Sequence, residues 1–166
     1  MSEPTIVLDH EQVQRKLRRI AHQLHEEYHT EKNIVLVGIA PRGALLALRL
    51  HNLLKDIAEF DVELVELSLD KDLPLEKPVR LSVGPENLRN RTVVLVDDVL
   101  MSGRTLMHAA SYLVQVPLRR LSTVVLVDRR HRAYPIRADI VGLTLSTTLQ
   151  EHISVRLGRK DSVQLS

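Results

Sequence analysis

Three aliphatic runs, each followed by a polar turn, constrain the fold more than any other feature of this 166-residue sequence. The runs are NIVLVGI at residues 33–39, TVVLV at residues 92–96 and STVVLV at residues 122–127. Apolar runs without alternating polar residues are typical of strands buried on both faces of a parallel sheet. Segments with helical spacing lie between the runs. We therefore predict an α/β fold in which right-handed crossovers place helices on both faces of the sheet.

Helical spacing is clearest near the start of the chain. Apolar residues recur there at intervals of three or four, at Val13, Leu17, Ile20, Leu24 and Tyr28. This spacing predicts an amphipathic helix over residues 10–30, with Asp9 as its N-cap. Further helices are predicted at residues 44–55 and 104–116, and further strands at residues 61–69 and 138–143.

Two segments do not fit the alternation of strands and helices. Residues 70–90 hold three prolines, a glycine and many charges, which favours a flexible loop with one short strand at residues 78–83. Residues 144–166 alternate polar and apolar positions on either side of a turn at residues 158–161, and this pattern predicts an antiparallel hairpin that forms a small hood. The length suits one domain, and we expect residues 1–166 to form it.

Composition excludes several classes of site. Cysteine is absent, which removes disulfides, thiolate metal sites and cysteine nucleophiles together. The formal net charge of +2 does not by itself indicate a nucleic-acid partner, and we interpret the local arginine clusters as solvated faces. No apolar run approaches the roughly 18 residues of a membrane span, and the first residues do not resemble a signal peptide. We therefore expect a cytoplasmic protein.

The chemistry is concentrated in the stretch VVLVDDVLMSGRT at residues 93–105. Asp97 and Asp98 end a buried strand that is predicted over residues 92–98, and a small-residue turn then leads into a helix. Free backbone N–H groups, hydroxyls and the positive end of the helix dipole would face one anion there, as in a phosphate site. Adjacent carboxylates suit vicinal sugar hydroxyls or a phosphate-bound Mg²⁺. The alternative is a strand end with a helix-capping acid, which does not explain the glycine turn.

This stretch resembles the phosphoribosyl pyrophosphate (PRPP) binding signature of type I phosphoribosyltransferases. The segments RRIAHQL, LVGIAPRGALLA and LVDRRHRAYPIRADIVG also resemble one branch of that family, the pyrimidine-operon regulators that have uracil phosphoribosyltransferase activity. The resemblance implies a twisted, mainly parallel sheet flanked by helices, with a small hood. It also implies transfer of 5-phosphoribose from PRPP to a pyrimidine base. Uracil is the base that the resemblance favours, and the products would then be UMP and pyrophosphate.

The resemblance assigns roles residue by residue. Asp97 and Asp98 would hold the ribose hydroxyls, with Mg²⁺ nearby and bound partly through the ligand. The 5′-phosphate would be held by Met101, Ser102, Gly103, Arg104 and Thr105, and the pyrophosphate by Pro41, Arg42 and Gly43. Arg42 would neutralise charge on the leaving group and count as catalytic with the two aspartates. Lys71 and Asp72 would lie in a lid, and Arg130, Ile136 and Arg137 would surround the base.

Departures from the branch concern the base loop and the lid. Arg130 replaces a glycine of the family, and if that position has positive φ the change costs roughly 1 kcal/mol. The lid is shorter than in the family and has Lys71 and Asp72 in place of an arginine and an aspartate. A lysine gives a point charge where an arginine gives a planar fork, so turnover could be reduced.

RNA binding is the main alternative function. The branch binds leader RNA, and Arg19, His22, Arg132 and Arg137 match its motifs. Arg18, Pro41 and Leu143 depart from those motifs, and few aromatic residues are available to stack bases, so we expect catalysis rather than specific RNA regulation. A purine transferase is a third possibility that the base loop disfavours. The histidines at positions 22, 25 and 29 are interpreted as solvated, not as zinc ligands. The resemblance also implies a homodimer or tetramer.

Overall fold

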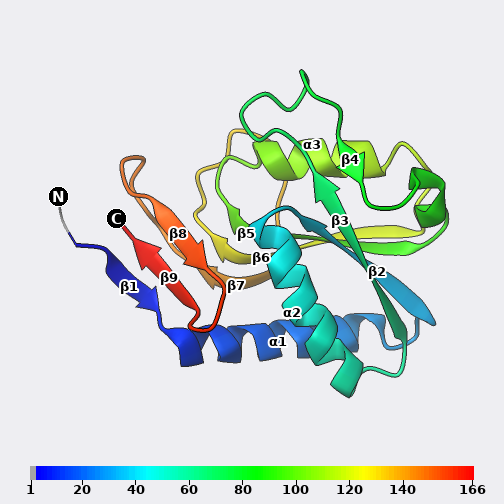
Figure 1. Cartoon of the computed structure of the whole chain (residues 1–166), viewed down its shortest axis with the longest axis horizontal. Helices are drawn as coiled ribbons and strands as arrows, with labels where there is room; N and C mark the ends of the chain where they lie inside the picture. Colours follow the sequence, from blue (N-terminus) through cyan, green and yellow to red (C-terminus); the bar gives the residue numbers. More distant parts are fainter. Residues whose placement is uncertain (1–2) are drawn as a thin grey trace.

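The computed structural model describes residues 3–166 and contains two β-sheets (Figure 1). The larger sheet has the order β4-β3-β2-β5-β6-β7, and only the contact between β4 and β3 is antiparallel. Its strands are β2 (Asn33–Ile39), β3 (Asp61–Ser68), β4 (Arg80–Leu81), β5 (Thr92–Leu100), β6 (Arg120–Asp128) and β7 (Ile140–Thr144). The predicted α/β fold with a mainly parallel sheet is confirmed.

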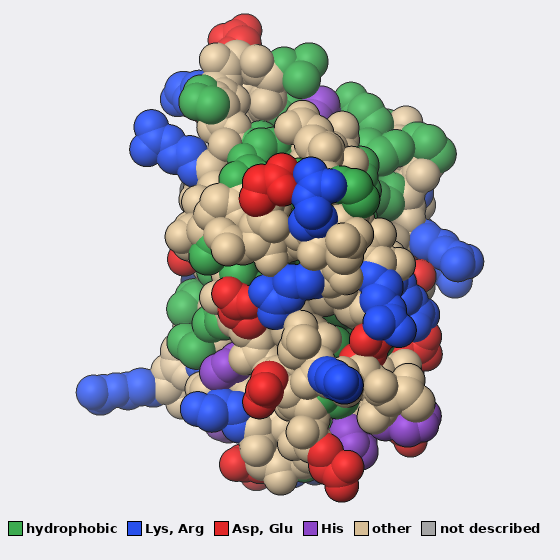
Figure 2. Space-filling model, turned by 90° about the vertical axis from the view of Figure 1, so that its right-hand side faces the viewer, with side chains coloured by type: hydrophobic (Ala, Val, Ile, Leu, Met, Phe, Trp, Pro, Cys, Tyr) green, Lys and Arg blue, Asp and Glu red, His purple; other side chains and the backbone are tan. Residues whose placement is uncertain are grey.

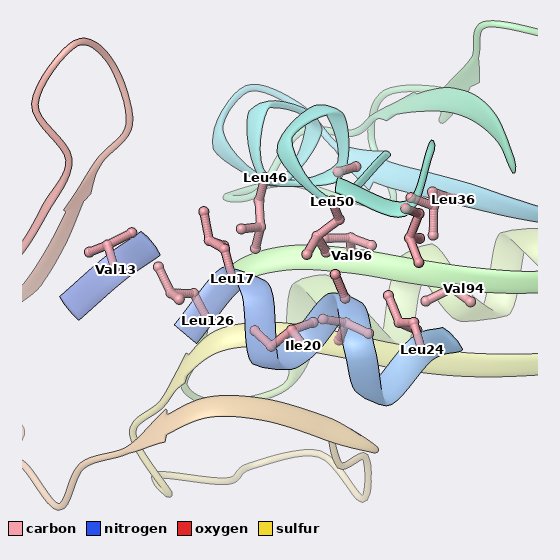
Figure 3. Close-up of a cluster of buried hydrophobic side chains, with 14 of the residues drawn as sticks. Val13, Leu17, Ile20, Leu24, Leu36, Leu46, Leu50, Val94, Val96 and Leu126 are labelled. Carbon is pink, nitrogen blue, oxygen red and sulfur yellow. The ribbon is translucent and has the colours of Figure 1, made fainter. Parts of the chain in front are cut away.

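Helices cover both faces of this sheet, as predicted. They are α1 (His10–Tyr28), α2 (Arg42–Ile57) and α3 (Arg104–Leu113). Helices α1 and α2 pack together on one face, and α3 packs on the other. Figure 3 shows side chains of α1 and α2 meeting aliphatic side chains of the central strands. The labelled residues are Val13, Leu17, Ile20 and Leu24 of α1, Leu46 and Leu50 of α2, and Leu36, Val94, Val96 and Leu126 of the strands.

Helix α1 begins where its sequence predicts. The Asp9 carboxylate accepts a hydrogen bond of 2.9 Å from the Gln12 backbone N–H, and the Gln12 side chain accepts one of 2.9 Å from the Asp9 N–H. This reciprocal capping box satisfies two donors at the helix start. The five apolar residues that predicted the helix are all buried. The helix after the glycine turn ends at Leu113, three residues earlier than predicted, and Pro117 follows shortly after.

A three-stranded antiparallel sheet with the order β1-β9-β8 forms the hood. Its strands are β1 (Thr5–Leu8), β8 (Ile153–Arg156) and β9 (Ser162–Leu165). The buried Asp161 carboxylate, between β8 and β9, accepts hydrogen bonds of 2.7 and 3.1 Å from Arg49 on α2 and one of 2.5 Å from Gln14 on α1. These contacts hold the hood on the two helices.

Residues 69–91, between β3 and β5, contain the two-residue strand β4 and the 3-10 helix η1 (Pro85–Leu88). The side of the molecule to the right in Figure 1 carries acidic and basic side chains interspersed, without a patch of one sign (Figure 2). None of the helices among residues 3–166 is long and apolar enough to cross a membrane.

Candidate functional site

Four segments meet at the carboxyl ends of the parallel strands. We call them the β2 loop (residues 40–43), the β3 segment (residues 69–79), the β5 loop (residues 101–105) and the β6 loop (residues 128–137), each after the strand that it follows. Ligands of open parallel sheets bind at this edge because loops and helix N-termini converge there. All the residues predicted for PRPP and the base lie in these segments or at the end of β5.

Asp97 and Asp98 lie inside β5, which continues to Leu100 and so extends two residues past the predicted strand. Their residues are 3% and 6% exposed, and the Asp98 N–H donates a 2.9 Å hydrogen bond to Asp97 Oδ1. Burial, with the Asp98 charge adding to it, raises the pKa of Asp97 to about 8, although Lys71 acts in the opposite direction. An acid pair with little solvent favours a cationic or hydroxyl-bearing partner.

Each of the two acids already faces a cation from a neighbouring segment. Arg42 Nε, in the first turn of α2, donates to Asp98 Oδ2 over 3.2 Å. Lys71 Nζ, from the β3 segment, lies 3.8 Å from Asp97 Oδ1. The structure thus brings the residues predicted for pyrophosphate and for the lid onto the predicted ribose acids.

The β2 loop approaches β5 closely because of a glycine. A Cβ on Gly43 would lie 2.7 Å from the Val96 carbonyl oxygen and 3.0 Å from Asp97 Cα. Any larger residue would push the start of α2 away from the acids. The Ala40–Pro41 peptide bond in this loop is cis.

The β5 loop has the geometry of an anion cradle. Gly103 has φ of 85° and is the N-cap of α3, so the turn uses a left-handed conformation that favours glycine. The Ser102 hydroxyl accepts a 3.2 Å hydrogen bond from the Arg104 N–H. A cavity is lined by Asp97 together with the whole loop, Met101 to Thr105. One hollow therefore joins the predicted ribose and phosphate residues.

The β6 loop is fixed to the β5 loop by main-chain contacts and by Arg132. The Ser102 carbonyl oxygen accepts hydrogen bonds from the N–H groups of Ala133 and Tyr134. The Arg132 guanidinium donates to the carbonyl oxygens of Met101 and Ile136 and to the Asp128 carboxylate, over 2.8, 3.0 and 2.7 Å. Sequence reasoning placed Arg132 with RNA and missed this role. The i,i+4 spacing of Asp128 and Arg132 was the available signal.

The predicted base residues differ in how they meet the site. Ile136 packs on the glycine turn, because a Cβ on Gly103 would lie 2.7 Å from Ile136 Cγ2. Arg130 has φ of 64°, so the expected left-handed backbone is present, and its N–H donates to Asp128 Oδ1 over 2.9 Å. The Arg137 side chain is 88% exposed and points to solvent more than to the cavity.

Arg129 belongs to the arginine cluster at residues 129–132, one of the local clusters interpreted from the sequence as solvated faces. That interpretation is wrong for Arg129, which is 4% exposed. Its guanidinium donates to Thr147 Oγ1 over 3.0 Å and to the carbonyl oxygens of Thr148 and Glu151 over 3.2 and 2.5 Å. It thus holds the chain leading into the hood beside the site. These partners are far away in sequence, so no local pattern indicated them.

The predicted RNA residues do not gather into one free basic surface. Arg19 on α1 donates to the carbonyl oxygens of Val141 and Gly142, over 3.0 and 2.6 Å, and to the Gln23 side chain. His22 and Arg137 are exposed, whereas the Arg132 guanidinium is engaged in the site. Arg19 can therefore serve the packing of α1 on β7 without any RNA.

Fold and site together define an α/β protein in which an acid pair and a glycine turn lie at the carboxyl edge of a doubly covered parallel sheet. The family model for the phosphoribosyl transferase domain matches residues 5–160, and the chain belongs to this family. It is 39% identical over 165 residues to a protein of Haemophilus ducreyi named Bifunctional protein PyrR, covering 95% of this chain and 92% of that one. It is 40% identical over 162 residues to the Streptomyces coelicolor protein of the same name, covering 93% and 84%.

Solved structures give the same fold. The hypoxanthine phosphoribosyltransferase of Trypanosoma cruzi superposes with a TM-score of 0.77 at 19% identity, covering 96% of this chain and 95% of that one. A hypoxanthine-guanine phosphoribosyltransferase of Bacillus anthracis gives a TM-score of 0.71 at 21% identity, covering 87% and 85%. The type I phosphoribosyltransferase fold, with a small hood, is therefore confirmed.

Proposed function

We propose that the protein transfers 5-phosphoribose from PRPP to uracil, giving UMP and pyrophosphate. The proposal rests on the cavity lined by Asp97 and the β5 loop, together with the ion pair of Arg42 with Asp98, the residue next to Asp97. This arrangement supports a ligand with a phosphate at one end, a diol in the middle and a charged leaving group at the other. The choice of a pyrimidine base rests on the resemblance of residues 126–142, LVDRRHRAYPIRADIVG, to the pyrimidine-regulator branch of the family.

In the proposed reaction a base nitrogen bonds to C1′ of the ribose as the bond from C1′ to the pyrophosphate oxygen breaks, and the proton of that nitrogen passes to the departing pyrophosphate. The transition state has the character of an oxocarbenium ion and a departing anion, so catalysis depends on neutralising the leaving group and excluding water. We assign Arg42 to the pyrophosphate, because its guanidinium can exchange the Asp98 carboxylate for phosphate oxygens. Asp97 and Asp98 would orient the ribose hydroxyls.

Mg²⁺ is the metal that this site would hold. Asp97 and Asp98 offer buried carboxylate oxygens, and among residues 3–166 no group of three or more His, Asp or Glu side chains forms an all-protein metal cage. Such a donor set suits Mg²⁺, which uses one or two carboxylates together with substrate oxygens. When bound, the ion would neutralise pyrophosphate charge.

The base would lie beside the β6 loop. We assign the backbone of Ile136 and Arg130 to its edge, and Arg137 to the rim of the site. The hydrogen bonds of the β6 loop to Met101 and Ser102 support this assignment, since they hold the base loop at a fixed distance from the phosphate cradle.

The test is pyrophosphate release from PRPP and Mg²⁺ with a panel of uracil, cytosine, hypoxanthine and guanine. We expect release with uracil and at least 100-fold slower release after Asp97→Asn combined with Asp98→Asn, an order of magnitude typical for loss of positioning and electrostatic stabilisation. Asp56→Asn is the matched control, because Asp56 is exposed on α2. PRPP binding without release on any base would contradict the proposal, and a faster reaction with a purine would overturn the choice of uracil.

RNA regulation with weak or lost catalysis is the second candidate, favoured by the word bifunctional in the relatives' name. Exposed Arg18, Arg19 and His22 on α1 would supply the phosphate contacts. Binding to a pyrimidine-operon leader RNA should weaken with salt, and replacing Arg18 and His22 by Ala should reduce that salt dependence by about one ion per lost contact. Equal binding to unrelated RNA of the same length would count against regulation.

We also propose a cytoplasmic homodimer or tetramer. Leu45 and Leu48 on α2 and Leu64 on β3 are 44%, 42% and 37% exposed and line one apolar hollow with Pro41. Contiguous exposed leucines of this kind favour contact with another protein surface. A second copy fits because the same apolar patch can meet itself across a two-fold axis.

A further inference from the structure

We propose that Arg104 is a positioning residue that holds the β3 segment closed over the acid pair. The inference rests on the proposed function for its catalytic consequence only. We use the word latch for the side-chain hydrogen bond by which Arg104 holds the β3 segment. The latch is a property of the ligand-free protein and can be measured without turnover.

The contact that carries this inference joins two segments far apart in sequence. Arg104 Nη2 donates a 2.8 Å hydrogen bond to the carbonyl oxygen of Asp72. Arg104 is the first residue of α3, directly after the Gly103 turn, so its backbone belongs to the phosphate cradle while its side chain reaches the β3 segment. In Figure 1 this segment, between β3 and β4, projects above the sheet on the side of α3.

The β3 segment is folded so that it presents this carbonyl oxygen. Asp70 Oδ1 accepts hydrogen bonds of 3.0 Å from the N–H groups of both Asp72 and Leu73. Lys77 Nζ lies 3.1 Å from the other oxygen of Asp70. The turn is therefore internally organised, and Arg104 needs to hold only one point of it.

Residues 71–73 and 75–77 are exposed, so apart from buried Pro74 and the Lys71–Asp97 ion pair little else holds the middle of the segment in place. Leu73 and Leu75 are 47% and 86% exposed, and Pro74 is the buried residue between them. A segment with few apolar contacts opens easily, so a charge-assisted hydrogen bond has a large influence on its position. Arg104 donates that hydrogen bond from the first turn of α3.

The closed position has a direct consequence for the acid pair. Holding Asp72 places the preceding residue, Lys71, with its Nζ 3.8 Å from Asp97 Oδ1. Arg42 occupies Asp98 in the same way. The ligand-free site is thus neutralised by two cations from loops. A ribose diol would displace the Lys71 ammonium group from Asp97. The latch would still hold the segment, so this ammonium group would stay beside the pyrophosphate.

The acceptor is a main-chain carbonyl oxygen, so the latch does not depend on the side chain at position 72. This feature gives a lid that lacks the arginine and aspartate pair of the family another way to close. It also predicts which substitutions matter, since Arg104 is required and the Asp72 carboxylate is not.

Hydrogen exchange of the ligand-free full-length protein tests the latch. In Arg104→Met we expect the amides of residues 72 and 73 to exchange about tenfold faster, the size of effect that one charge-assisted hydrogen bond gives. Arg159→Met is the matched control, because Arg159 is an exposed arginine in the hood, and Asp72→Asn should keep the wild-type exchange of residue 73. Unchanged exchange in Arg104→Met, with the strands still protected, would overturn the inference.

Kinetics then test the catalytic consequence. Arg104→Met should lower kcat about tenfold while the KM for uracil stays within twofold, because lid closure matters after the base has bound. Arg104→Lys should recover part of the loss. Faster exchange with unchanged kcat would overturn the positioning role. If the wild-type protein shows no transfer at all, the proposed function fails while the exchange result still decides the latch.

Discussion

The Arg132 guanidinium donates a 2.8 Å hydrogen bond to the carbonyl oxygen of Met101, and this contact ties the β6 loop, which we assign to the base, to the β5 loop, which we assign to the phosphate. Two further hydrogen bonds from the same group reach Ile136 and Asp128. A lysine cannot reproduce this planar fork. We therefore expect Arg132→Lys to raise the KM for the base about tenfold and the KM for PRPP much less, because the cradle itself is intact.

Steady-state kinetics with both substrates varied measure this split, with Arg159→Lys as a control that makes the same replacement at an exposed position outside the site. If Arg132 served RNA alone, its substitution would leave both KM values unchanged.

Arg130 occupies a left-handed backbone conformation, with φ of 64°, in the loop that we assign to the base. A glycine adopts this conformation without the steric penalty, although it also gains freedom in the unfolded chain. Arg130→Gly should stabilise the protein by about 0.5–1 kcal/mol in urea denaturation. Arg130→Ala is the control, since it removes the side chain and keeps the strain. Equal stability of the two variants would show that the backbone conformation carries no cost.

The sheet and α1 could be predicted from the sequence because local patterns of apolar residues indicate which of their faces are buried. The aliphatic runs mark strands covered on both faces, and the spacing of Val13 to Tyr28 marks one helix face. Strand β1 escaped prediction because its four residues become a strand only by pairing with β9, where Thr5 lies opposite Leu165. A contact between the two ends of a chain leaves no local periodicity.

In the candidate site, too, features with a local sequence pattern could be predicted, whereas features that depend on distant contacts could not. The Asp97 to Thr105 stretch was predictable because strand, acids, glycine turn and helix are consecutive. The long-range side-chain contacts of Arg104, Arg129 and Arg132 were not, since they join residues 18 to 32 positions apart. Side-chain hydrogen bonds to distant carbonyl oxygens depend on the tertiary fold. The sequence therefore predicts which residues lie together at the strand ends better than it predicts the contacts that hold the loops.

The apolar patch of Leu45, Leu48 and Leu64 should be the contact between subunits. Leu48→Lys puts a charge into an interface core, which such cores disfavour, and we expect it to shift the protein from dimer or tetramer toward monomer in sedimentation velocity. Leu149→Lys is the control, because Leu149 is 71% exposed and lies outside the patch. A wild-type monomer, or a Leu48→Lys protein of unchanged size, would contradict this assignment.

Asp161 should contribute to stability in a way that acid removes. Burial alone would raise the pKa of Asp161, but hydrogen bonds from Arg49, the Gly158 N–H and Gln14 together lower it. A lowered carboxyl pKa stabilises the fold above the unfolded pKa of about 3.9, and this contribution disappears as pH falls through the folded value. Asp161→Asn should therefore cost roughly 3 kcal/mol at pH 7, because it breaks a partly buried ion pair.

Urea denaturation at pH 7 and pH 3 measures the effect, and the difference between wild type and variant should shrink at the lower pH. Asp56→Asn should change neither value. A variant that is equally destabilised at both pH values would indicate lost packing in place of lost charge.

Asp97 should make the free energy of unfolding fall as pH rises, which is opposite to the effect of Asp161. Its pKa is raised to about 8 by burial and by the Asp98 charge, whereas an unfolded chain has a value of about 3.9. The folded protein therefore binds a proton that the unfolded chain releases. The stability gained from this proton is present below the unfolded pKa and is lost as pH rises from about 4 through about 8, by at most about 1.4 kcal/mol per pH unit.

Metal-free, ligand-free wild-type protein should thus become less stable from pH 5 to pH 9 in urea denaturation, and Asp97→Asn should remove most of this slope. Asp56→Asn should keep it. Binding of PRPP with Mg²⁺ needs the ionised carboxylate, so its affinity should rise over the same range and proton release should accompany binding near pH 7. An Asp97→Asn protein that keeps the wild-type slope would place the titrating group elsewhere.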